Sequence, residues 1–193
     1  MRELGRAGGP DYARTLGVIG QWVKGGLVPP EHQCVVHNRI ATVLAEGGAE
    51  DEAREALTAA QVAAHTELER AYTLAQLGSI EARLGNWGRA RGYAEQAARL
   101  IPAAGGEEAW LDVLMRTTSV FFRIENTVRD RDHQRVELLA QKLVDVCGQQ
   151  IDRWGSDHPR TLEAVVWRVL LMTLGGGLVG VPRACWPGVL WVC

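Results

Sequence analysis

The chain has 193 residues, enough for one domain or a short repeat array, and its net charge of −2 gives a pI near 6.2. Proteins that hold nucleic acid by its phosphates need a basic surplus, so this charge argues against direct nucleic-acid binding. Hydrophobic residues make up 47% of the chain and many are alanine, which favours helices packed closely on one another.

Apolar residues recur at helical spacing between breaks rich in glycine and proline, and no segment alternates with a period of two. We therefore expect an all-α fold of about eight helices without a sheet. Asn86 is expected to cap the fifth helix, and Gly155 to end the seventh. The predicted helices cover residues 11–25, 31–44, 50–64, 67–84, 87–100, 107–125, 131–153 and 159–173.

One short phrase occurs near both ends of the predicted helical region. Residues 9–16 and 155–162 share Gly, Asp, Arg, Thr and Leu at the same offsets, and the two copies start 146 residues apart. That distance corresponds to about four units of roughly 37 residues, a period typical of stacked helical arrays. Such arrays bind partners along a surface, so the repeat favours a binding function over a catalytic one.

The clearest single unit spans residues 71–104. Gly78 and Ala90 are small where two helices would cross, Gly85 permits a tight turn, and Ala97 leaves room for the next unit. At these offsets the unit resembles a tetratricopeptide repeat, a pair of antiparallel helices in about 34 residues. The resemblance implies a right-handed α-solenoid. The unit departs from the pattern in having a polar Glu81 and a small Ala94.

Two other segments extend the resemblance over residues 1–173, which we interpret as one repeat domain. Residues 34–67 repeat the glycine and alanine offsets of the second half of the clear unit. Residues 107–173 are similar to the longer repeats of kinesin light chains and their bacterial relatives. The match is carried by Gly155, Asp157, His158, Pro159, Thr161 and Leu162.

The last segment, residues 174–193, is an irregular apolar tail rich in glycine, proline and tryptophan, and it continues no helical period. We expect either a fragment of a longer protein or a tail from a shifted reading frame. Repeat arrays need polar end caps, so ends without them predict self-association. The apolar run at residues 169–181 has 13 residues, against about 20 for a membrane span, so a membrane partner is not expected.

Cysteine usage indicates a reduced compartment. Cys34, Cys147, Cys185 and Cys193 lie far apart and form no C-x-x-C pair, and no apolar leader opens the chain. We expect free thiols in a cytoplasmic protein, with Cys147 buried in a helix.

We expect no enzyme, because no acid, base and nucleophile stand at catalytic spacing. His158 and Asp157 are explained by a helix start, with the Asp as cap. His32 and His37 are five residues apart, which does not place them on one helix face for a metal. The glycine run at residues 175–180 lacks the preceding strand of a nucleotide-binding loop. No metal or cofactor is expected.

The resemblance implies a protein or peptide partner bound in a concave groove lined by the first helix of each unit. Asn38 and Arg83 are the foremost candidates, because an amide can pair with a peptide backbone and a guanidinium with a carboxylate. The predicted groove residues are Asn38, Thr42, Glu46, Tyr72, Ser79 and Arg83. Two alternatives stay open: a sensor segment of a larger signalling NTPase or transcription regulator, and a membrane-associated adaptor.

Overall fold

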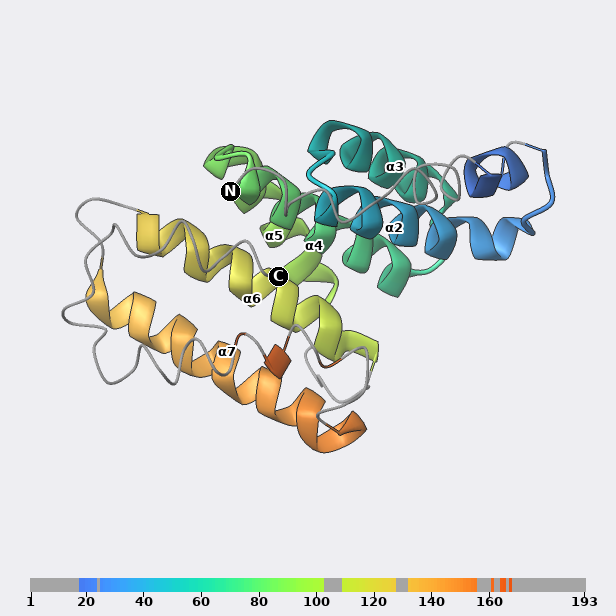
Figure 1. The fold of residues 1–193 in the computed structure, drawn as a ribbon. Helices are drawn as coiled ribbons and strands as arrows, with labels where there is room; N and C mark the ends of the chain where they lie inside the picture. Colours follow the sequence, from blue (N-terminus) through green and yellow to red (C-terminus); the bar gives the residue numbers. More distant parts are fainter. Residues whose placement is uncertain are drawn as a thin grey trace. The chain divides into compact units, whose positions relative to one another are not determined.

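The computed structural model describes residues 18–23, 25–102, 109–127 and 132–155, with residues 161, 164, 165 and 167 (Figure 1). Within these ranges the regular structure is entirely helical and contains no strand. No helix in the described part is both long and apolar enough to cross a bilayer. The chain divides into two compact units, Met1–Ala103 and Ala104–Cys193.

Residues 30–100 of the first unit form four helices that pack on their neighbours in chain order, and the described residues 18–23 before them are also helical. A three-residue turn joins the first two, so they form a helical hairpin, and residues 84–86 join the second two in the same way (Figure 1). The α3 helix then packs against α4 and links the two hairpins. The helices are α2 (Pro30–Glu46), α3 (Glu50–Ala63), α4 (Glu67–Arg83) and α5 (Trp87–Leu100).

Glycines with a left-handed backbone conformation lie in the turns of both hairpins. Gly48 has φ 79° and Gly85 has φ 78°, a conformation that a residue with a Cβ adopts only with strain. The predicted turn at Gly85 is therefore confirmed. The α2 helix begins one residue earlier than expected, at Pro30, because proline suits the first helical turn, where its missing N–H costs nothing.

Small side chains bring the helices of the first unit close together. Ala90 and Ala97 are fully buried, and a Cβ built on Gly78 would lie 3.3 Å from the carbonyl oxygen of Ala90 on α5. The predicted close crossing is thus confirmed, and Gly78 allows it. A second group of buried residues joins the two hairpins and consists of Ala41, Ala45, Ala53, Leu57, Leu77 and Ile80.

The second unit has a core of larger side chains between α6 (Ala109–Thr127) and α7 (His133–Trp154). Phe122 meets Trp167 edge-on, with ring centroids 6.1 Å apart, and the guanidinium of Arg123 lies over the same indole. Cys147 is fully buried in this core, as predicted from its apolar neighbours. Gly155 ends α7 with φ 82°, which also agrees with the sequence.

One prediction about a helix end is confirmed in position but not in its hydrogen bond. Asn86 occupies the N-cap position of α5, but its side chain makes no capping hydrogen bond. Its Nδ2 instead donates to Glu81 Oε2 at 2.7 Å, because Glu81 is a buried carboxylate in need of a donor. The predicted helix at 159–173, the tail at 174–193 and the first copy of the repeated phrase lie wholly or largely outside the described residues.

Candidate functional site

A line of polar side chains runs between α2 and α4 in the first unit. Cys34, Asn38 and Thr42 follow each other at four-residue spacing on α2 and so lie on one face of that helix. They meet Thr73 and Gln76 of α4. We call these five residues the polar seam.

Asn38 is the centre of the polar seam and is only 4% exposed. Its Nδ2 donates to Cys34 O at 2.9 Å and to Thr73 Oγ1 at 2.9 Å. The Thr73 hydroxyl donates its own hydrogen bond to Glu69 O at 2.8 Å, and its oxygen lone pairs accept from Asn38. Asn38 is therefore fixed by bonds within and between the two helices.

Two amide atoms of the polar seam are left without a partner. Thr42 Oγ1 donates to Asn38 O at 3.0 Å and lies 3.5 Å from Gln76 Oε1. Asn38 Oδ1 and Gln76 Nε2 are buried and make no hydrogen bond in the structure. A buried polar group without a partner costs free energy. The polar seam thus offers one spare acceptor and one spare donor, the two functions that a peptide unit carries.

The thiol at the N-terminal end of the polar seam is unreactive by environment. Cys34 is fully buried, and burial raises the pKa of its thiol above the ordinary 9.0, although its hydrogen bonds with Thr73 and Asn38 oppose this. Burial also lowers the pKa of His37 below 6.5. Among the described residues no three His, Cys, Asp or Glu side chains gather in a way that would hold a metal.

The other predicted groove residues on α4 make local contacts. Ser79 Oγ donates to Ala75 O at 3.1 Å within its own helix. Arg83, whose side chain is 25% exposed, donates through Nη2 to Ala45 O at 2.7 Å and to Glu50 Oε1 at 2.8 Å. Tyr72 is half-buried and also has a contact within the protein. Arg83 therefore bonds α4 to the last turn of α2 and to the first residue of α3.

The predicted residues on α2 divide into two groups. Asn38 and Thr42 come together in the polar seam, whereas Glu46, one turn further along, is exposed. Sequence reasoning missed Cys34, Thr73 and Gln76 as their neighbours. The repeat length could have identified these neighbours, because the contacts that cross from α2 to α4 join residues 34 to 39 apart, close to the length of one repeat unit.

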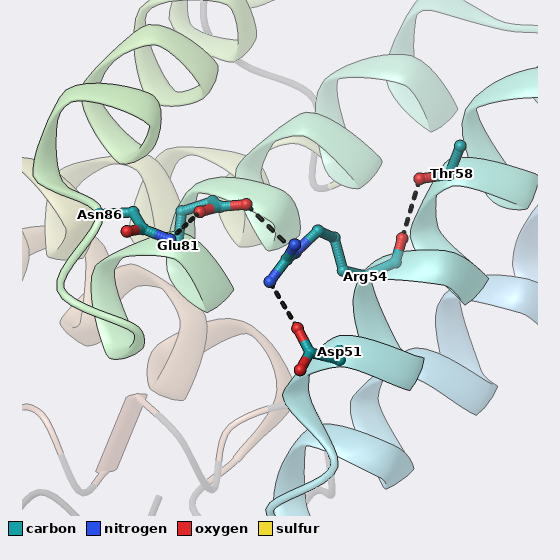
Figure 2. Close-up of polar contacts among 5 residues, drawn as sticks. All are labelled: Asp51, Arg54, Thr58, Glu81 and Asn86. Carbon is teal, nitrogen blue, oxygen red and sulfur yellow. Dashed lines mark hydrogen bonds and ion pairs between the residues drawn. The ribbon is translucent and has the colours of Figure 1, made fainter.

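Ion pairs join the two hairpins at the C-terminal end of α4. Figure 2 shows Arg54 of α3 reaching Glu81 of α4, with Nε 3.3 Å from Oε1. The Arg54 Nε–H makes no hydrogen bond, so this contact is an ion pair without hydrogen-bond geometry. Arg54 Nη2 also donates to Asp51 Oδ1 at 2.7 Å. The Arg54–Glu81 and Arg83–Glu50 pairs together are named the ionic clasp.

Glu81 is the most buried member of the ionic clasp, at 1% exposed. Its carboxylate is satisfied by Arg54 on one oxygen and by Asn86 Nδ2 on the other (Figure 2). This arrangement explains a polar residue at a position where the repeat pattern predicts an apolar one. A charge removed from water is tolerated when it is paired and hydrogen-bonded.

The polar seam and the ionic clasp are features of this chain's own geometry. Comparison with protein-family models, curated proteins and solved structures gave no match.

Proposed function

We propose that this chain is a non-catalytic scaffold that binds a peptide or a partner domain along the face built by α2 and α4. In this proposal the helical pairs form a right-handed solenoid of the tetratricopeptide type, with residues 107–173 as a longer repeat. The observation that carries the proposal is the polar seam, with its unpartnered Asn38 Oδ1 and Gln76 Nε2.

The direction of the two helices supports a repeat array. Contacts between α2 and α4 progress from Cys34 with Thr73 at one end to Ala45 with Arg83 at the other. Both helices therefore run in the same direction, each as the first member of its hairpin. In stacked arrays the equivalent helices of successive units line one continuous surface, which suits an extended ligand.

The chemistry of the polar seam supports a peptide main chain as the ligand. An amide oxygen accepts from a backbone N–H and an amide NH₂ donates to a backbone C=O, so the two spare atoms match one peptide unit. The exposed Glu46 beside the seam adds a negative charge at its edge. Main-chain recognition gives affinity that does not depend on the partner's side chains, while the edge residues give selectivity.

The experiment starts from capture of partners by the whole chain from the source cell, followed by affinity measurement with the recovered peptide. Gln76→Met removes the spare donor and keeps the side-chain volume. We expect it to weaken binding about tenfold, or roughly 1.4 kcal/mol. Gln96→Met, on the exposed face of α5, is the matched control and should leave the affinity unchanged.

A second pair of variants tests the edge of the face. Glu46→Arg on α2 should change the affinity, while Glu52→Arg, at an exposed glutamate on α3, should not.

Equal affinities for Gln76→Met and wild type, with circular dichroism showing both folded, would exclude the polar seam from the binding face.

A further inference from the structure

The buried carboxylate of Glu81 belongs to the helix that packs on the first hairpin, and small and large side chains both form that interface. Ala41, Ala45 and Ala53 of the first hairpin contribute little apolar area there, so the apolar part of the interface depends on Leu57, Leu77 and Ile80, and the polar contacts of Glu81 add to it. Arg54 is the cation that compensates Glu81. Without Arg54, the carboxylate would keep only its hydrogen bond from Asn86.

The second pair of the ionic clasp has the opposite polarity. Here α4 supplies the cation, Arg83, and α3 supplies the anion, Glu50. Arg83 also donates to Ala45 O at 2.7 Å, so α4 is bonded to the end of α2 as well as to the start of α3. The last turn of α4 therefore carries three polar bonds to the first hairpin.

The polar seam is closed in this arrangement. Cys34 is fully buried, and Asn38 and Gln76 are only 4% and 5% exposed. A ligand can reach the unpartnered amide atoms only if α2 moves away from α4. The contacts inside the seam are few and neutral. At its C-terminal end, the buried carboxylate of Glu81 would make the contact between the hairpins unfavourable if its cation were lost.

We propose that the ionic clasp is a gate for the polar seam: when it opens, the α2–α3 hairpin separates from α4 and exposes the seam amides to a peptide main chain. The identity of the ligand rests on the function proposed above. The motion itself does not, and it is tested without a ligand.

Loss of one partner of the buried pair has a different consequence from loss of both. Arg54→Met strands a buried carboxylate, which is strongly destabilising for the interface. Replacement of both residues, in Arg54→Met/Glu81→Met, leaves neutral side chains of fitting size, which often costs little. The gate should therefore open in the single variant and close again in the double variant.

Cys34 reports the opening directly because it is a buried thiol inside the polar seam. The full chain is treated with N-ethylmaleimide in the folded state, and alkylation of each cysteine is followed by peptide mapping in a mass spectrometer. We expect Arg54→Met to raise the alkylation rate of Cys34 at least about tenfold. The free energy that a tenfold change represents is smaller than the cost of leaving a buried charge unpaired. Cys147, fully buried in the second unit, should keep its rate.

Three controls separate gating from general loss of structure. Arg39→Met, an exposed arginine on α2, should leave Cys34 at the wild-type rate. Arg54→Met/Glu81→Met should return Cys34 close to that rate. Amide hydrogen exchange in α5 should stay unchanged in every variant, because the α4–α5 hairpin remains intact when the gate opens.

Several outcomes would overturn the proposal. They are an unchanged Cys34 rate in Arg54→Met, equal acceleration of α5 exchange, or a double variant as fast as the single one. If Arg54→Met fails to fold, Glu81→Gln is used, which keeps the side-chain shape and removes the charge. It should accelerate Cys34 to a smaller extent, and a wild-type rate would again refute the gate. A gate that opens as expected in a chain that binds no peptide would refute only the proposed function.

Discussion

Gly78 lies at the crossing of α4 and α5, where the space for a side chain is set by backbone atoms. A Cβ at this position would stand 3.3 Å from Ala90 O and 3.5 Å from Ala94 N, which cannot rotate away as a flexible side chain would. Gly92, on α5, has nothing within 4 Å of the equivalent point. A side chain at Gly78 would therefore press on the backbone of α5, whereas a side chain at Gly92 would meet no neighbour.

We expect Gly78→Leu to lower the free energy of unfolding by about 2–3 kcal/mol through overpacking at the crossing. Gly92→Ala should raise it by about 0.5–1 kcal/mol, because alanine favours the helix and meets no neighbour. Urea denaturation followed by circular dichroism measures both. A Gly78→Leu variant as stable as wild type would show that α4 and α5 can separate without cost.

Arg83 has a structural role that its position in a predicted binding groove did not reveal. Its guanidinium bonds Ala45 O and Glu50, so Arg83→Glu would set a carboxylate against a carbonyl and another carboxylate. We expect a loss of about 1–3 kcal/mol in stability. Arg89→Glu, on the exposed face of α5, should change stability by less than about 0.5 kcal/mol. Equal melting temperatures for the two variants would argue against the clasp geometry.

At the level of elements, α4 starts with the strongest local signal in the first unit. Thr66 Oγ1 accepts from Glu69 N at 3.2 Å, and Glu69 Oε2 accepts from the backbone N–H of Thr66 at 3.0 Å, which together form a capping box. Glu69 Oε2 also accepts from His65 N at 2.8 Å. Local sequence thus determines where the helix that carries Thr73, Gln76 and Glu81 begins.

The capping box makes the stability of α4 depend on pH. Burial acts to raise the pKa of Glu69, but the backbone N–H groups of His65 and Thr66, the Thr66 hydroxyl and the nearby charge of His65 together hold that pKa below its ordinary 4.5. A carboxylate with a lowered folded-state pKa contributes stability above its unfolded value and loses it as pH falls through the folded one.

We therefore expect wild type to be more stable than Glu69→Gln at neutral pH, and the difference to shrink as the pH falls from about 4.5. Thermal denaturation of both proteins across that range measures it. Glu67→Gln, at a neighbouring exposed glutamate, is the control, because it also removes a charge from the first turn but leaves the hydrogen bonds of Glu69 in place. A stability difference that stayed constant with pH would contradict this role of Glu69.

On the scale of the whole molecule, each compact unit has a core of its own. The first relies on alanine with a few large side chains such as Leu57 and Leu77, whereas the second uses Phe122, Trp167 and Met115. Alanine allows a close approach of helices but buries little apolar area per residue. The few leucines of the first unit consequently contribute much of its hydrophobic stabilisation.

Leu57→Ala should lower the free energy of unfolding by about 2–5 kcal/mol, because the leucine is fully buried where the two hairpins meet. Val62→Ala on the same helix is the control: its side chain is 86% exposed, so a change below about 0.5 kcal/mol is expected. Thermal or chemical denaturation distinguishes them. Similar costs for both would mean that the hairpin interface is not packed as described.

Local sequence was sufficient to predict the helices between residues 30 and 154. Their ends depend on Pro30, Gly48, Gly85 and Gly155, whose backbone preferences act on the nearest residues. The candidate site was only partly predictable. Asn38 and Thr42 were expected on one face, but that face turns toward α4 and buries Asn38 in a network with Thr73.

The amino-acid order by itself determined where the helices lie and which small residues let them cross, because hydrogen bonds and steric limits within a few residues decide both. Only the tertiary structure decided that Glu81 meets Arg54, that Arg83 meets Glu50, and that two amide atoms in the polar seam stay unpaired. Those outcomes depend on the relative placement of helices more than 25 residues apart, as the 34-to-39-residue spacing of the contacts between α2 and α4 illustrates. A side chain's own neighbours in sequence carry no information about such distant partners.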